Sequence, residues 1–118
     1  MRWLGGQIAL AASLIGCAGC GYSELHQVVF RTSPPTGRSI EVYMVGQPAP
    51  RPFDELALLQ IVSTGNQAEP RAVLAALSQR AAELGCDAMV RVRVDTGVTA
   101  THGYGVCVRT QEARAPAP

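Results

Sequence analysis

The feature that most limits the fold is a helix that lies between strands. Over Pro70 to Leu84, apolar residues recur at three- and four-residue spacing and form one stripe, which is typical of an amphipathic helix packed on a core. Pro70 suits the first helical turn, and Gly85 suits a left-handed cap after the last turn. The stripe consists of Val73, Leu74, Leu77, Ala81 and Leu84.

Strand patterns lie on both sides of this helix. Before it, residues 40–45 and 56–62 suit strands, and three prolines within 46–52 prevent the first of them from continuing. After it, residues 88–95 alternate, with Val90, Val92 and Val94 on one face, and residues 104–110 repeat this pattern. The predicted order is therefore β-β-α-β-β.

The order of the elements also predicts how the sheet is arranged. The helix joins two strands that should run parallel through a right-handed crossover. A helix about 10 Å wide covers roughly two strand spacings of about 4.8 Å, which leaves room for one strand between them. We predict an α+β fold, a two-layer sandwich with one helix on a mixed sheet and the C-terminal strand in the middle. In the predicted core, Val73, Leu74, Leu77 and Leu84 face Leu58, Val90, Val92, Val106 and Val108.

Residues 1–16 are typical of a bacterial lipoprotein signal peptide. A charge at Arg2 precedes a mostly apolar segment that is shorter than the about 20 residues of a spanning helix. The segment ends in Leu14-Ile15-Gly16-Cys17, which resembles the lipobox. This resemblance implies diacylglycerol on the Cys17 thiol, cleavage before Cys17 and acylation of the new amino group.

The C-x-x-C spacing of Cys17 and Cys20 leaves other interpretations open. A redox pair is expected at a helix N-terminus beside a βαβ unit, whereas these cysteines follow a charge-poor leader. A zinc site needs four ligands, and the other cysteines and both histidines are far away in the sequence. Secretion without lipid also stays open. Cys20 is the weaker lipidation candidate because the triplet before it lacks an aliphatic start.

Removal of the signal peptide leaves 102 residues, enough for one small domain and a tether. We predict a lipidated tether over 17–37, an α+β domain over 38–112 and a disordered tail over 113–118. The apolar island 28–30 within the tether can still pair as an edge strand. Nine arginines then balance nine acidic residues, and no basic patch or polybasic segment stands out. We therefore expect no nucleic-acid partner.

The acyl chains are then expected to hold the protein on the lipid bilayer without help from charge. Ala18 follows Cys17, so the aspartate that retains some lipoproteins in the inner membrane is missing. We expect an outer-membrane lipoprotein that faces the periplasm.

A pattern around the helix resembles a known family. It consists of Pro52-Phe53-Asp54-Glu55-Leu56 and the run Ala81-Ala82-Glu83-Leu84-Gly85-Cys86-Asp87-Ala88-Met89-Val90. These residues resemble the strand, helix and strand of the YbjQ-type family, described as heavy-metal-binding, and of the Rcs envelope-stress sensor lipoproteins. The resemblance implies a shared fold and, for the sensors, an outer-membrane anchor with a proline-rich tether. The sensors carry a cysteine on the strand that matches residues 90–95, where this chain has none.

The sequence contains no arrangement typical of a catalytic site. Both histidines are solitary, Asp54-Glu55 suits a turn or cap, and Gly103-Tyr104-Gly105 suits a bend beside a strand. We expect no enzyme activity, no cofactor and no small-molecule substrate. The preferred hypothesis is a non-catalytic envelope module whose exposed sheet face binds a protein partner or senses the envelope.

The alternative hypothesis is a metal-binding module that uses Cys86, Cys107 or His102, since soft thiolates hold copper(I) or zinc. A Cys86–Cys107 disulfide is not expected. If the valines of both final strands share a face, Cys107 lies opposite Arg91 or Arg93, and Cys86 lies about 16–24 Å further along. Direct pairing of the two cysteines needs a one-residue slip that reverses every side chain.

Overall fold

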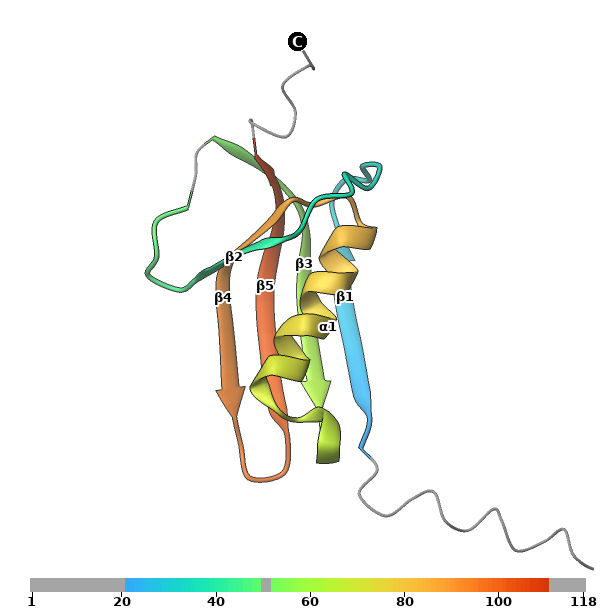
Figure 1. Cartoon of the computed structure of the whole chain (residues 1–118), viewed down its shortest axis with the longest axis vertical. Helices are drawn as coiled ribbons and strands as arrows, with labels where there is room; N and C mark the ends of the chain where they lie inside the picture. The colour runs from blue at the N-terminus through green and yellow to red at the C-terminus, as the bar shows by residue number, and fades with distance from the viewer. Residues whose placement is uncertain (1–20, 50–51, 111–118) are drawn as a thin grey trace, which may run out of the picture.

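The computed structural model describes residues 21–49 and 52–110, and within them the chain forms one α-helix and a five-stranded mixed sheet (Figure 1). The fold is therefore α+β, as predicted. A short 3-10 helix, Gly65–Gln67, precedes the α-helix. The elements are β1 (Ser23–Val29), β2 (Glu41–Met44), β3 (Phe53–Ser63), α1 (Pro70–Glu83), β4 (Ala88–Thr96) and β5 (Thr101–Thr110).

The sheet has the order β1-β3-β5-β4-β2. β5 runs antiparallel to both β3 and β4, so these two strands are parallel to each other with one strand between them. The predicted position of the C-terminal strand is confirmed. α1 connects β3 to β4 and lies across one face of the sheet (Figure 1).

The ends of α1 follow the sequence signals. Pro70 occupies the first turn, where its missing N–H costs no helical hydrogen bond. Gly85 has φ +89°, and the chain closes the helix with two backbone hydrogen bonds: Cys86 N–H donates to the Ala81 carbonyl (3.0 Å) and Gly85 N–H to the Ala82 carbonyl (3.1 Å). This pairing is a Schellman motif, which turns the chain back toward the sheet.

The main core lies between α1 and the sheet. Gly103 on β5 lets the two layers approach closely, because a Cβ there would lie 2.5 Å from Cγ1 of Val73. Leu77 packs beside the same glycine and is fully buried. The buried members of this core are Leu56, Ala57, Leu59, Ile61, Val73, Leu77, Ala81, Cys86, Met89, Val92 and Cys107.

The sheet includes residues that the sequence assigned to the tether. β1 pairs antiparallel with β3 in a continuous register, with Val28 opposite Leu58. The folded part therefore begins earlier than the predicted residue 38. Most β1 side chains are exposed, so this edge strand carries no apolar periodicity that would have marked it. Only the apolar island 28–30 indicated that pairing.

A β-bulge at Arg91 changes which residues of β4 face the helix. Val90 lies opposite Val106, but Arg93 lies opposite Tyr104, so β4 has one extra residue between these pairs. The bulge turns Val90 away from the helix, whereas Val92 faces it. The prediction that the valines of β4 share a face with Val106 and Val108 is therefore wrong.

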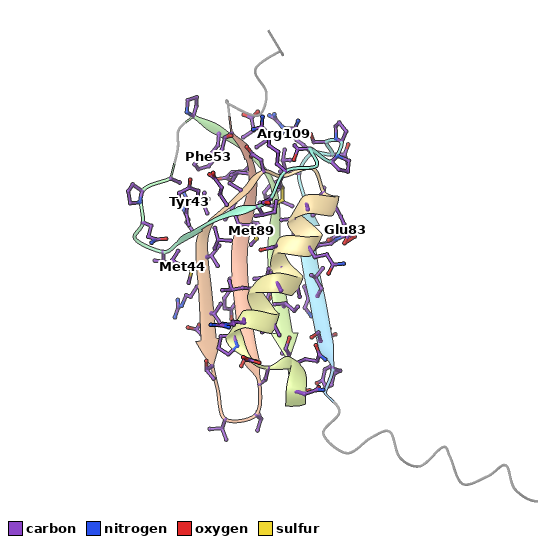
Figure 2. All side chains as sticks on the ribbon, viewed as in Figure 1. Tyr43, Met44, Phe53, Glu83, Met89 and Arg109 are labelled. Carbon is purple, nitrogen blue, oxygen red and sulfur yellow. A yellow bond between two sulfur atoms is a disulfide. The ribbon has the colours of Figure 1, made fainter. Side chains whose placement is uncertain are left out.

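A second, smaller core lies on the face away from α1. It comprises Ala88, Val90, Val106 and Val108, and the partly buried Tyr43, Ala49 and Phe53 pack against it. Figure 2 shows Tyr43 and Phe53 near the β2 edge of the sheet. Leu58, which the sequence placed in the main core, is 42% exposed on this same face. Its exposure leaves part of the sheet without a cover.

Candidate functional site

The uncovered part of the sheet forms a groove on the face opposite α1, here called the open face. Its volume is about 380 Å³. Three exposed side chains from neighbouring strands provide apolar surface: Val28 (55% exposed), Leu58 (42%) and Tyr104 (36%). The groove is lined by His26, Gln27, Val28, Leu58, Leu59, Gln60, Arg91, Tyr104, Gly105 and Val106.

These side chains meet because the strand registers place them side by side. Val28 lies opposite Leu58, and Leu58 lies opposite Val106. Two residues further along each strand, on the same face, His26 lies opposite Gln60, and Gln60 lies opposite Tyr104. The result is one apolar row across three strands beside one polar row. Such a mixture of aromatic, aliphatic and hydrogen-bonding groups is typical of a binding surface.

Arg91 lies at the edge of this groove in an unusual backbone conformation. Its φ of +53° is in the left-handed region, which for a residue with a Cβ costs roughly 1–2 kcal/mol. The bulge directs its side chain over the open face, where Nη1 lies 3.8 Å from Oε1 of Glu55. Strained residues and bulges often occur where a side chain has to be aimed at a ligand.

A second hollow of about 320 Å³ lies on the other side of Arg91. It is lined by the turn after β2 and by the second core, with Met44, Gly46, Gln47, Pro48, Ala49, Phe53, Val90 and Arg91 as its residues. Arg91 therefore belongs to both hollows, and its guanidinium provides a cationic group between two largely apolar surfaces.

Cys86 and Cys107 form a disulfide, contrary to the prediction. Their Cα atoms are 5.7 Å apart, within the range for such a bridge. Both residues are fully buried in the main core, between α1 and the sheet. The predicted absence of an intrachain bridge is wrong for two reasons.

The first reason is the bulge at Arg91. It lets Cys107 pair with Met89 on the helix face while Val90 and Val106 still share the opposite face. The second reason is the path of the chain before β4. The prediction continued the strand back to Cys86, but Cys86 closes the Schellman motif of α1 and lies above the sheet. The distance between the cysteines is then much shorter than along an extended strand.

The residues of the metal-binding alternative do not come together. Cys86 and Cys107 are bonded to each other and cannot act as thiolate ligands in this state. His102 lies five residues from Cys107 along β5 and points to the opposite face, where its ring stacks on Tyr104 with centroids 6.4 Å apart. Among residues 21–49 and 52–110, no group of three or more histidine, cysteine or acidic side chains could hold a metal ion.

The other two candidate motifs lie inside strands. Asp54 and Glu55 belong to β3 and not to a turn or cap, and they form separate ion pairs, Asp54 with Arg31 and Glu55 with Arg91, each at 3.8 Å. Gly103-Tyr104-Gly105 is part of β5 and not a bend beside it. Its two glycines face α1 or the residues beneath it, and its tyrosine reaches the open face.

Two charged residues, the buried Asp87 and the partly buried Arg109, form hydrogen bonds near the end of β5. The Asp87 carboxylate accepts hydrogen bonds from the Thr110 backbone N–H (2.9 Å) and hydroxyl (2.5 Å). Arg109 Nη1 donates to the Ser33 hydroxyl (2.6 Å) and to the carbonyls of Pro34 and Gly85 (3.0 Å each). Figure 2 shows Arg109 at the end of the sheet where the connection from β1 to β2 passes. Neither residue lines the groove.

The predicted lipidation residue Cys17, the signal peptide and the tail 113–118 lie outside the described residues. In the part of the chain that the structure describes, none of the helices has the length and hydrophobicity needed to cross a bilayer. Comparisons of the chain with protein-family models, with curated protein sequences and with solved structures find no match.

Proposed function

We propose that the protein is a non-catalytic binding module of the bacterial cell envelope, which contacts a protein partner through its open face. The observation that carries this proposal is the groove over Val28, Leu58 and Tyr104, an apolar surface on a sheet whose other face is packed against a helix. Contiguous exposed apolar surface with a polar rim is typical of interaction sites.

A protein partner fits this surface better than a small molecule. The groove is shallow and lies across three strands, so a small ligand would stay exposed on one side. Tyr104 offers a large amphipathic contact of the kind enriched at interface centres, and Arg91 can pair with a carboxylate on the partner.

We also propose that the module is anchored by acyl chains on Cys17 and faces the periplasm from the outer membrane. The lipobox-like residues at the end of the apolar leader and the absence of an aspartate after Cys17 support this location. A role in reporting envelope state belongs to the same proposal.

The anchor is tested by replacing the proposed lipidation residue. Cys17→Ser should leave an uncleaved precursor without lipid, because the serine hydroxyl cannot form the thioether. Metabolic labelling with palmitate and mass spectrometry of the mature N-terminus measure both effects. Cys20→Ser is the matched control and should be processed and labelled normally. A mature protein that starts elsewhere with an unmodified Cys17 would overturn the anchor.

The binding face is tested with a photoreactive amino acid placed at one position of the full chain in living bacterial cells. At Leu58 it would lie in the groove, whereas at the exposed Ala75 it would lie on the outer side of α1. We expect one recurrent envelope protein to cross-link at Leu58 and not at Ala75. Equal adducts at both positions, or an adduct at Leu58 that contains only a second copy of this chain, would contradict the proposed partner.

A further inference from the structure

The two outer edges of the sheet differ in how well they are protected. β2 has only four residues, contains a register shift, and leads into a turn with Gly46 and Pro48. These are devices that keep an edge from pairing with another chain. β1 has seven residues in an unbroken register and contains neither proline nor lysine. The edge formed by β1 is therefore open to a further strand.

The hydrogen bonds at both ends of β1 show which backbone groups face outward. Thr64 N–H donates to the Tyr22 carbonyl (2.8 Å), and Phe30 N–H donates to the Leu56 carbonyl (2.7 Å). In an antiparallel pair such bonds occur at every second residue, so the even-numbered residues of β1 bond to β3. Ser23, Leu25, Gln27 and Val29 then direct their N–H and C=O groups outward. In the described part of the chain, no strand lies beyond β1.

The side chains of β1 are complementary to β1 itself in the antiparallel direction. If Leu25 lies on a two-fold axis, Glu24 lies opposite His26 of the second copy, and Tyr22 lies opposite Val28 of that copy. A carboxylate then faces an imidazole, and an aromatic ring faces a β-branched side chain, and both kinds of pair stabilise sheets. Each pair occurs twice because the arrangement is symmetric.

Neighbouring registers lack this complementarity. A two-fold axis at Glu24 would place the two Glu24 carboxylates opposite each other, which is destabilising. With the axis at His26, Glu24 would face the apolar Val28. Only the register centred on Leu25 pairs the Glu24 carboxylate with the His26 imidazole and also pairs the exposed apolar groups, Tyr22 (59% exposed) and Val28 (55%).

The helices do not obstruct such a pairing. α1 packs on β5 and its two neighbours, and β5 lies two strands in from the β1 edge. The two β5 strands would be five strand spacings of about 4.8 Å apart, so the helices of the two copies would be roughly 24 Å apart, about twice the diameter of a helix. A two-fold axis perpendicular to the sheet keeps both helices on one face and both open faces on the other.

We propose that β1 pairs antiparallel with β1 of a second copy, with Leu25 at the two-fold axis, to form one continuous ten-stranded sheet. Tyr22 of the second copy would extend the groove beside Val28. An interface of one strand pair is small, so the dimer is expected to be weak and to depend on concentration. This inference does not depend on the proposed partner or on the anchor.

Cysteine cross-linking of the full chain in intact bacterial cells tests the register, in a background where Cys20 is serine. The two Leu25 Cα atoms would be about 5.5 Å apart, within reach of a short thiol-to-thiol cross-linker. Those of Gln27 would be separated by about 13 Å along the strands. We expect a covalent dimer for Leu25→Cys and not for Gln27→Cys. Cys17 is present in both variants, so it cannot account for a difference in dimer yield between them. Equal yields, or cross-linking of Gln27→Cys alone, would overturn the proposed pairing.

A charge swap provides a second, independent measurement on the Leu25→Cys chain. His26→Glu places carboxylates opposite each other across the interface and should lower the yield of covalent dimer about tenfold. The double variant Glu24→His/His26→Glu restores opposite partners and should restore the yield. Thermal melting checks that both variants fold. A double variant that stays as low as the single variant would contradict the proposed contacts.

Discussion

Leu77→Ala is expected to lower the free energy of unfolding by about 2–5 kcal/mol, a large part of the stability of a small domain. Leu77 is fully buried and packs against Gly103 of the central strand, where the helix approaches the sheet most closely. The smaller side chain would leave a cavity that a glycine on the facing strand cannot fill. Denaturant unfolding followed by circular dichroism measures the loss.

Leu58→Ala is the matched control for this variant. The same truncation on the open face removes a side chain that is 42% exposed, so we expect a loss below about 1 kcal/mol. Equal losses for both leucines would mean that the assignment of the two faces is wrong. An unchanged unfolding midpoint for Leu77→Ala would show that the stripe of α1 does not form the core.

Removal of the Cys86–Cys107 disulfide is expected to cost about 3 kcal/mol, since it closes a loop of 21 residues in the unfolded chain. The double variant Cys86→Ala/Cys107→Ala should melt at a clearly lower temperature than the unmodified chain. A reductant should lower the melting temperature of the unmodified chain to a similar value, and it should leave the double variant unchanged.

Peptide mapping without reductant provides the control for this prediction. A linked fragment that contains Cys86 and Cys107 should be recovered from monomeric protein. Alkylation of both cysteines in the folded, unreduced chain would contradict the bridge and, with it, the position of Cys86 at the end of α1.

The sequence was sufficient to predict α1, four of the five strands and the order of the last three strands. The helix between two strand patterns required a parallel pair with a gap, and β5 occupies that gap. Pro70 marked the start of the helix because the first turn does not need its missing N–H. Gly85 marked the end because the cap after the last turn needs a positive φ. These features are local, so they could be recognised without knowledge of the tertiary structure.

The faces of the sheet could not be predicted, because a bulge has no reliable signature in this sequence. Residues 90–95 alternate between valine and a charged residue, yet Val90 and Val92 point in opposite directions on either side of Arg91. A glycine at the bulge would have suggested a left-handed residue, but an arginine does not. The error about the disulfide followed from this bulge and from the turn at the end of α1, which takes Cys86 out of line with β4.

The candidate site was predicted only as an exposed sheet face, without its residues. Val28 lies on a strand that was assigned to the tether, and Leu58 was assigned to the core. Tyr104 was interpreted as part of a bend beside a strand, and no pattern singled out Arg91. The groove exists only where three strands from distant parts of the chain meet, so no single segment carries its signal.

If the open face binds a partner as we propose, the side chain that the strained Arg91 backbone directs over this face should contribute to binding. Arg91→Gly tests this claim, since glycine adopts a φ of +53° without penalty but has no side chain. The measurement is the yield of the partner adduct at a photoreactive residue 58, compared with the melting temperature of the same variant. We predict a melting temperature that is unchanged or higher and an adduct that falls about tenfold. An unchanged adduct, with the fold intact, would contradict the account.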